Sequence, residues 1–444
     1  MAQDPTVPRL TPATMERVGQ VDERYQSYNV EMLEVTGGRF WKPYKDIVET
    51  SAKTAGQAGS STDQGGDIPA GMSADLYQYR PPTDLANRRP RTMAVALAPA
   101  YVRISGTWAN TTFFADSDTP PKDPPAGYGG VLTRRQWLGA VAFSHAVDAP
   151  IVTSMPNGEG TRGLDGVWRP DQARRWLAFT KANGGTIAAA EYFNEPTLAM
   201  MGGAPKGYDA AAYGRDHRIF EAFMREEYPD TKLLAPGSVG ESTADWGVAA
   251  GGYNDLKVLP AAALAASTGG ADVFSYHHYG AVSQRAAAMG HQTSAGQALS
   301  EDWLGRTDQT LAYYRGVRDK FMPGKPFWNT ETAESAAGGN PWAGTFLDSF
   351  RYLDQLGRLA RQGVAVVFHN TLVASDYGLL DETTFEPKPN YWGALLWRQL
   401  MGTTVLDPGG RMLPACTSMR IACATFRAAW CCWCSTPIGR KASP

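Results

Sequence analysis

The sequence predicts an α/β fold, a (β/α)8 TIM barrel, from three observations. Short apolar, β-prone runs alternate with segments of helical spacing, which is the pattern of a parallel sheet covered by helices. About eight such strand–helix units follow one another, and eight close a barrel. Two of the predicted strands end in a glutamate, and the carboxyl ends of barrel strands form the mouth where catalytic groups lie.

Residues 18–34 are predicted to form the first barrel strand, after a polar, proline-spaced arm over residues 1–17. This strand would bring Asn29 and Glu31 to the barrel mouth, although an edge strand with solvated polar positions fits equally well. The segment 36–76 then exceeds the 2–6 residues of an ordinary strand-to-helix loop. We interpret it as an insertion loop over the mouth, with a plain flexible insertion as the alternative.

The next units keep the alternation. Residues 100–107 form the predicted second strand, whose Ser-Gly-Thr ending leaves Thr107 where polar groups would face a substrate. A helix is predicted from the apolar spacing of residues 134–147, followed by a strand over 149–155 and a helix over 171–182.

The fourth strand begins near residue 188 and ends in Asn194, Glu195 and Pro196, where the proline stops it. Taken alone, this ending could be only a strand end with a capping side chain. The seventh strand ends in a second acid, Glu331. The other predicted elements are strands at 232–238, 273–279, 327–331 and 364–370 and helices at 218–228 and 345–362.

Two carboxylates that converge at a barrel mouth are what glycoside hydrolysis requires, one to protonate the leaving oxygen and one to attack the sugar carbon. Two neighbouring acids, Glu191 and Glu334, fit the catalytic roles less well. Glu191 would point to the same side as Glu195 but deep inside the barrel, where a charge is costly unless paired. Glu334 falls in the loop after Glu331 and is not assigned the nucleophile role.

Five short motifs accompany the two acids in a fixed order: YFNEP at 192–196, FSYHHY at 274–279, GGNP at 338–341, DQLG at 354–357 and YGLLD at 377–381. Asn-Glu-Pro alone is shared by many barrel glycosidases. The ordered set resembles glycoside hydrolase family 79, the heparanase and β-glucuronidase family of the retaining barrel clan. The resemblance runs from about residue 21 to residue 406.

The resemblance implies retaining hydrolysis of β-glucuronides through a covalent glycosyl-enzyme intermediate, with Glu195 as acid/base and Glu331 as nucleophile. The two carboxyl groups would then lie ~5–5.5 Å apart. The acid needs a raised pKa, which the aromatic neighbours Tyr192 and Phe193 and the charge of Glu331 could provide.

The resemblance also implies the substrate contacts. Asn194 would bind the sugar 2-hydroxyl, with a purely structural amide as the alternative. His277 and Tyr279 would orient substrate and nucleophile; a metal site at His-His-Tyr lacks an evident third ligand, so no metal or other cofactor is expected. The remaining contacts would bind the glucuronate carboxylate, with a simple turn as the alternative for the first two: Gly338, Gly339, Tyr377 and Gly378.

Exo-β-glucuronidase activity is the leading interpretation. A mouth closed by the 36–76 insertion would favour it, whereas an open cleft rimmed by cations would favour endo-β-glucuronidase, heparanase-like cleavage of heparan sulfate type glycosaminoglycans. An inactive or misfolded glycan-binding relative is the third possibility, although the presence of both acids argues against it.

The formal net charge of -2 and pI near 6.3 give no case for nucleic acid as a partner and weaken the case for a long polyanion. No stretch approaches the ~18 apolar residues of a membrane span. The chain begins without a secretion-signal pattern, so it is expected to be cytoplasmic unless a signal has been removed, in which case it is secreted or periplasmic. The sequence does not indicate an oligomeric state.

The predicted barrel domain covers residues 18–406, and residues 407–444 form an atypical tail where the family continues into a β-sandwich. All 5 cysteines lie in this tail, so the barrel depends on its core rather than on disulfides. The run Cys431-Cys432-Trp433-Cys434 resembles part of a zinc site, but no histidine or second cysteine pair completes it. We interpret the tail as a truncated or aberrant replacement of the sandwich.

Overall fold

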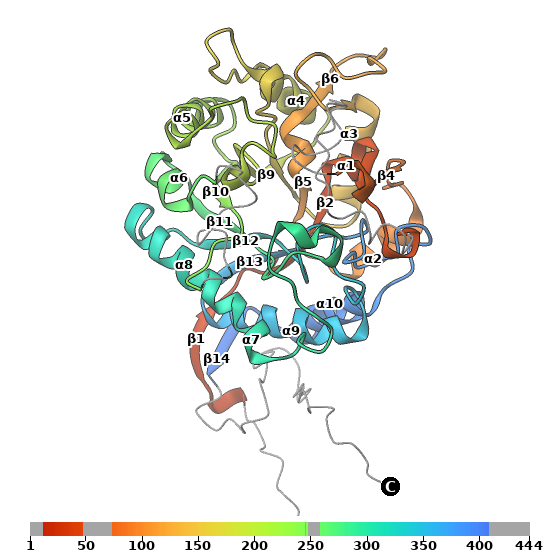
Figure 1. Cartoon of the computed structure of the whole chain (residues 1–444), viewed down its shortest axis with the longest axis vertical. Helices are drawn as coiled ribbons and strands as arrows, with labels where there is room; N and C mark the ends of the chain where they lie inside the picture. The colour runs from red at the N-terminus through yellow and green to blue at the C-terminus, as the bar shows by residue number, and fades with distance from the viewer. Residues whose placement is uncertain (1–11, 48–72, 245, 247–257, 408–444) are drawn as a thin grey trace, which may run out of the picture.

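The computed structural model describes residues 12–47, 73–244, 246 and 258–407. A closed barrel of eight parallel strands lies at its centre, in the order in which the strands follow in the chain, which confirms the predicted fold (Figure 1). The strands are β2 (Gln26–Glu31), β5 (Val102–Ser105), β8 (Ile151–Ser154), β9 (Ile187–Glu191), β10 (Lys232–Ser238), β11 (Val273–His278), β12 (Phe327–Thr332) and β13 (Val364–His369).

Helices surround the barrel on its outside (Figure 1). The start of α3 is a capping box. The hydroxyl of Thr133 accepts a hydrogen bond from the N–H of Gln136, and the side-chain oxygen of Gln136 accepts one from the N–H of Thr133. The long helices are α2 (Arg88–Ala96), α3 (Arg134–Ala146), α4 (Asp171–Ala182), α5 (Ala210–Glu227), α8 (Arg306–Phe321), α9 (Phe346–Arg361) and α10 (Pro389–Leu400), and the short ones are α1 (Met32–Thr36), α6 (Ala261–Ser267) and α7 (Glu301–Leu304).

The barrel interior is apolar at one level and polar at the next. A buried cluster that includes Tyr101, Trp328 and Phe368 fills the lower level, with ring centroids 5.2–6.2 Å apart. Because successive strand residues alternate between the two faces, Arg103 and Ser105 follow Tyr101 on the inside and nearer the mouth. The apolar level supports the polar residues from below.

The N-terminal strand assignment differs from the prediction over residues 18–34. Only β2 belongs to the barrel, and β1 (Glu16–Gln20) pairs antiparallel with β14 (Thr404–Asp407) in a separate two-stranded sheet at the bottom of Figure 1. The difference follows from burial. Every residue of β2 is buried, whereas β1 is mostly exposed and therefore suits a peripheral ribbon.

The segment 36–76 is framed by a hairpin rather than being wholly a loop. Strands β3 (Gly38–Trp41) and β4 (Tyr77–Arg80) pair antiparallel, and two further strands, β6 (Thr112–Ala115) and β7 (Gly130–Thr133), pair in parallel. Residues 48–72 and the predicted tail with its cysteines, residues 408–444, lie outside the described residues. Among the helices that are described, none is long and apolar enough to cross a membrane.

Candidate active site

Glu195 lies on a turn just beyond the fourth barrel strand. Strand β9 ends at Glu191, and a 3-10 turn begins at Pro196. Between them, Glu195 adopts a left-handed backbone conformation, with φ 56° and ψ 55°. A non-glycine residue held in this region carries strain of about 1–3 kcal/mol, and such strain is concentrated at functional sites.

Glu331 lies within the seventh strand and reaches the mouth through a bulge. Phe327 packs in the outer core and Trp328 in the barrel interior, so regular alternation would turn residue 331 outward. The pairing of β12 with β13 shifts register between Asn329 and Thr332, which reverses that alternation. Bulges re-aim side chains in this way beside active sites.

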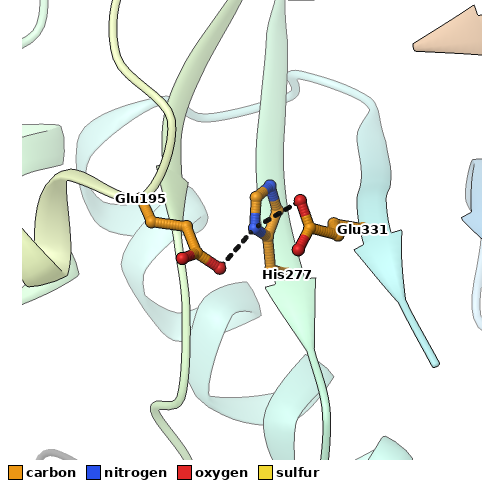
Figure 2. Close-up of side chains that lie close together, drawn as sticks. All are labelled: Glu195, His277 and Glu331. Carbon is orange, nitrogen blue, oxygen red and sulfur yellow. Dashed lines mark hydrogen bonds and ion pairs between the residues drawn. The ribbon is translucent and has the colours of Figure 1, made fainter. Parts of the chain in front are cut away.

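His277 stands between the two acids (Figure 2). Its Nδ1 atom is 2.9 Å from Oε1 of Glu195 and 3.7 Å from Oε2 of Glu331. One oxygen of each carboxylate and one nitrogen of His277 all lie within 4.8 Å of one another. The two acids predicted from the sequence therefore face each other across the mouth.

Arg103, which the sequence analysis did not select, donates hydrogen bonds to three residues of the site. Its guanidinium donates to Glu191 at 2.5 Å and to Glu331 at 3.0 Å, and its Nη2 also donates to Oδ1 of Asn194 at 2.6 Å. Burial opposes the charge of Arg103, but Glu191 and Glu331 more than offset it, so the pKa rises. Glu191 lies deep in the barrel and needs a partner for its charge, and Arg103 of the second strand is that partner. The inward direction of Arg103 could have been predicted from the alternation of residues 101–105.

The tautomer of His277 follows from its neighbours. Burial lowers the pKa of His277 to about 4, so the ring is neutral near pH 7. Its Nε2 lies 3.4 Å from the guanidinium of Arg103, which can only donate. The ring proton is therefore on Nδ1, where it can donate to Glu195.

Burial raises the pKa of Glu195 to about 7, while Arg103 lowers it and Glu191 raises it. The predicted cause is thus only partly right, because the neighbouring charge that raises the pKa is that of Glu191 and not that of Glu331. Tyr192 was also expected to supply apolar surroundings, but its hydroxyl lies 3.3 Å from the carboxylate of Asp216, in a separate buried network.

A chain of hydrogen bonds holds the other side of Glu331. The hydroxyl of Tyr279 donates to Oε1 of Glu331 at 2.5 Å. The amide of Asn370 donates to Tyr279 at 2.8 Å, to Tyr377 at 3.1 Å and to Glu31 at 3.3 Å. Asn370 was missed by the sequence analysis, although it follows the eighth strand, and it connects three residues that were predicted.

The carboxyl group of Glu31 is buried at the mouth. Burial, with the charges of Glu331 and Glu34, raises its pKa well above the usual range. A Cβ atom on Gly106 would lie 1.6 Å from Oε2 of Glu31, so only glycine fits there. The two other predicted mouth residues contribute less: the amide of Asn29 donates to the backbone of Thr330 at 3.3 Å, and Thr107 is half-buried at the start of a 3-10 turn.

Gly338 and Gly339 form a bend with φ values of 84° and 83°. The hydroxyl of Ser283 donates to the carbonyl of Ala337 at 2.8 Å, and that of Ser375 donates to the carbonyl of Gly338 at 2.9 Å. Because C=O and N–H point in opposite directions across a peptide, these anchors turn the N–H groups of Gly338 and Gly339 away from the serines. Successive N–H groups of this kind make anion-binding concavities.

Glu334 closes the same loop. Its Oε2 accepts hydrogen bonds from the N–H of Asn340 and the hydroxyl of Ser335, and its Oε1 accepts one from the side chain of Asn340, all at 2.8 Å. Gly378, by contrast, donates its N–H to the carbonyl of Ser375 at 3.2 Å. The expectation that Gly378 offers a backbone donor to a substrate is therefore not supported by this arrangement.

Glu195, His277 and Glu331 are close enough to hold a metal ion. The guanidinium of Arg103 already places a positive charge 3.0 Å from Glu331 and 3.4 Å from His277. A second cation would be repelled there, since like charges at such distances disfavour each other. The donor set thus fits a metal poorly.

The known proteins to which this chain is similar in sequence include heparanases and heparanase-like proteins. Heparanase-like protein 1 of Arabidopsis thaliana is 27% identical over 288 residues, which cover 62% of this chain and 49% of that protein. Heparanase of Mus musculus is 26% identical over 369 residues, covering 73% of this chain and 65% of that protein. The chain thus spans about half to two thirds of the length of these relatives. No protein-family model matches it.

Solved structures share the fold. A 4-O-α-L-rhamnosyl-β-D-glucuronidase from Fusarium oxysporum superposes with a TM-score of 0.54 at 14% identity, covering 89% of this chain and 72% of that one. An α-L-arabinofuranosidase from Thermotoga maritima gives a TM-score of 0.56 at 12% identity, covering 88% and 73%. The curated relatives confirm the resemblance to heparanases, glycoside hydrolase family 79, that the motifs around Glu195 and Glu331 predicted.

Proposed function

We propose that this chain is a retaining glycoside hydrolase that removes terminal β-glucuronic acid from glycosides. The observation that carries the proposal is the pair Glu195 and Glu331, which come from the ends of strands four and seven and bring carboxylate oxygens within 4.8 Å of each other. Retaining glycosidases hold their carboxyl groups ~5–5.5 Å apart, whereas inverting enzymes need ~6.5–9.5 Å to admit a water molecule. The observed approach favours the retaining geometry.

In the proposed reaction, the carboxylate of Glu331 attacks the anomeric carbon while Glu195 gives its proton to the leaving oxygen, which departs as an alcohol. Glu195 then accepts a proton from a water molecule, whose oxygen attacks the anomeric carbon and releases Glu331. A pKa of about 7 lets Glu195 serve as acid and as base near neutral pH. Tyr279 and Arg103 hold Glu331 in place for the attack.

Two features support a uronic acid as the sugar. The oriented N–H groups of Gly338 and Gly339 offer donors to a carboxylate, and the hydroxyl of Tyr377 lies in the same hydrogen-bond chain as Glu331. Arg103 occupies the oxygen of Asn194, which leaves the NH2 group of that amide to donate to a sugar 2-hydroxyl. Such a contact strengthens in the transition state.

The test is hydrolysis of 4-nitrophenyl β-D-glucuronide, with the first anomer formed followed by proton NMR. We expect the β-anomer from the wild type, and severely reduced turnover by Glu195→Gln and Glu331→Gln with the fold retained by circular dichroism. Glu386→Gln, an exposed glutamate, serves as the matched control. An α-anomer first, or undiminished turnover by either variant, would contradict the proposal.

Endo-acting cleavage inside a glycosaminoglycan is the second candidate, favoured by the heparanases among the relatives. Fragment analysis of heparan sulfate distinguishes it, since an endo enzyme produces oligosaccharides and an exo enzyme releases only the terminal sugar. Folded protein without turnover of either substrate would instead indicate an inactive relative.

A further inference from the structure

We propose that Asn110 is a positioning residue for the general acid, because it fixes the turn that carries Glu195. This inference rests on the proposed function, in which Glu195 protonates the leaving oxygen. Asn110 lies in the 3-10 turn Thr107–Thr111 that follows β5, and its exposure is 0%. It is thus supplied by the second strand unit, far in sequence from the acid.

The carboxamide of Asn110 binds both backbone groups of Asn194, the residue before Glu195. Its Oδ1 accepts the N–H of Asn194 at 3.1 Å, and its Nδ2 donates to the carbonyl of Asn194 at 3.1 Å. A carboxamide has one donor and one acceptor side by side, so it matches the edge of a single residue as a neighbouring strand would. Each bond fixes one of the two peptide planes that flank Asn194.

Asn110 is itself held on several sides. Its Oδ1 accepts a second hydrogen bond from Nδ2 of Asn157 at 3.1 Å, which fixes the amide orientation. Its backbone carbonyl accepts the N–H groups of Asn157 and Gly158 at 2.8 and 2.9 Å. A Cβ atom on Gly202 would lie 2.8 Å from Nδ2 of Asn110, so this glycine lets the chain approach closely. The amide therefore acts as a rigid anchor.

The turn needs such an anchor because the barrel ladder ends before it. Strand β9 ends at Glu191, and in the part of the chain that the structure describes Asn110 binds both backbone groups of Asn194. The side chain of Asn194 is held separately by Arg103. With Asn194 fixed at both peptide planes, the strained left-handed conformation of Glu195 keeps its carboxyl directed at His277.

Asn110→Asp is the most informative variant, because it conserves the shape of the side chain but replaces the NH2 group that donates to the carbonyl of Asn194 with an oxygen. We expect this change to move the acid without removing it. The readout is kcat/KM for aryl β-glucuronides with good and poor leaving groups. A misplaced acid should lower hydrolysis of phenyl β-glucuronide about 100-fold, because phenolate departs poorly without a proton. Hydrolysis of the 2,4-dinitrophenyl glycoside, which needs little protonation, should change by less than about 3-fold.

Two comparisons make the test decisive. Glu195→Gln should show the same leaving-group dependence in stronger form, and its absence there would refute the proposed role of Glu195 itself. Asn183→Asp is the matched control, since its amide also donates to a backbone carbonyl, that of Phe179 at 2.8 Å, but on the exposed end of α4. If Glu195→Gln shows the dependence and Asn110→Asp lowers both substrates equally, Asn110 has only a general structural role and the inference is overturned.

A folding failure of Asn110→Asp would be detected by circular dichroism. Asn110→Ser then replaces it, because serine can keep one of the two hydrogen bonds without adding a charge. The same selective loss with phenyl β-glucuronide supports the inference, and an equal loss with both substrates overturns it.

Discussion

The two candidate catalytic acids are held in opposite ways. Glu195 lies on a turn beyond its strand and is 16% exposed, and the hydrogen bonds of Asn110 hold the backbone of its neighbour Asn194. Glu331 lies inside its strand, is 8% exposed, and is fixed by side-chain contacts with Arg103 and Tyr279. The carboxyl group of Glu195 has a hydrogen bond with His277, whereas both oxygens of Glu331 accept hydrogen bonds, from Arg103 and from Tyr279.

This difference matches the two roles that the proposed reaction assigns. An acid/base must gain and lose a proton in each cycle, which a strongly bonded carboxylate resists. A nucleophile must remain aligned with the anomeric carbon until it attacks. Environments that differ in this manner are how two like carboxyl groups acquire separate functions.

The largest effect should come from deleting each carboxyl group and supplying azide. Glu331→Ala and Glu195→Ala should each lose on the order of 10⁴-fold in kcat with 4-nitrophenyl β-glucuronide or poorer leaving groups. Azide should then restore turnover with opposite products. In Glu331→Ala it attacks the substrate directly and gives the α-glucuronosyl azide, whereas in Glu195→Ala it attacks the glycosyl-enzyme and gives the β-azide. NMR of the products checks this, and identical anomers from both variants would contradict the division of roles.

Removing Arg103 should break the side-chain support of Glu331. Arg103→Met leaves the buried carboxylates of Glu191 and Glu331 unpaired, so we expect a loss of about 3–5 kcal/mol in the free energy of unfolding. Urea denaturation measures it. Adding Glu191→Gln should recover part of the loss, because one uncompensated charge is then removed. Strict additivity of the two changes would show that the pair does not interact.

The strands and both acids were predictable because barrel strands have a simple local signal. Apolar runs ended by Glu195 and Glu331 are visible without tertiary information, and the predicted bounds of α4 and β10 match the structure. The roles of these acids stay predictions until turnover is measured. The loop 36–76 was predicted less well, since pairing between β3 and β4 joins segments far apart in sequence.

The residues that support the acids were not predictable in the same way. Asn110 and Asn370 act through partners on other elements, and nothing local marks an asparagine that binds a backbone 84 residues away. Arg103 is the exception, because the alternation of residues 101–105 turns it inward. The bulge that turns Glu331 inward depends on the pairing of β12 with β13 and is invisible in the sequence. The source of the pKa shift of Glu195 was partly misjudged for the same reason, because the distance to Glu191 is set by the barrel.

The pH dependence should report Glu195, the less buried of the two acids. Glu195 must be protonated for the first step, and burial raises its pKa to about 7 from an ordinary 4.5. The alkaline limb of the pH–activity profile should therefore begin near pH 7, with kcat/KM retained below this pH and falling about tenfold per pH unit above it. Without the raised pKa of Glu195, this limb would begin near pH 4.5. The kcat/KM profile of a phenyl glucuronide checks this. In Glu195→Gln the limb should disappear, and its persistence would assign it to another group.

The smallest effect should come from Glu334, which shapes the loop after Glu331 without touching either acid. Glu334→Gln offers one acceptor oxygen where the carboxylate offers two, so either the N–H or the side-chain amide of Asn340 loses its partner. The bend at Gly338 and Gly339 should loosen, which would weaken uronate binding while leaving Glu331 in its strand. We expect KM for 4-nitrophenyl β-glucuronide to rise about 10-fold with kcat changed less than about 2-fold.

A neutral substrate makes this last measurement specific. The corresponding β-glucoside has no carboxylate, so its slow hydrolysis should be the same in the wild type and in Glu334→Gln. The exposed Glu386→Gln again provides the matched control. If Glu334→Gln lowers hydrolysis of the glucuronide and of the glucoside equally, the loop supports Glu331 rather than the uronate. The hydrogen bonds of Glu334 would then help to position the nucleophile.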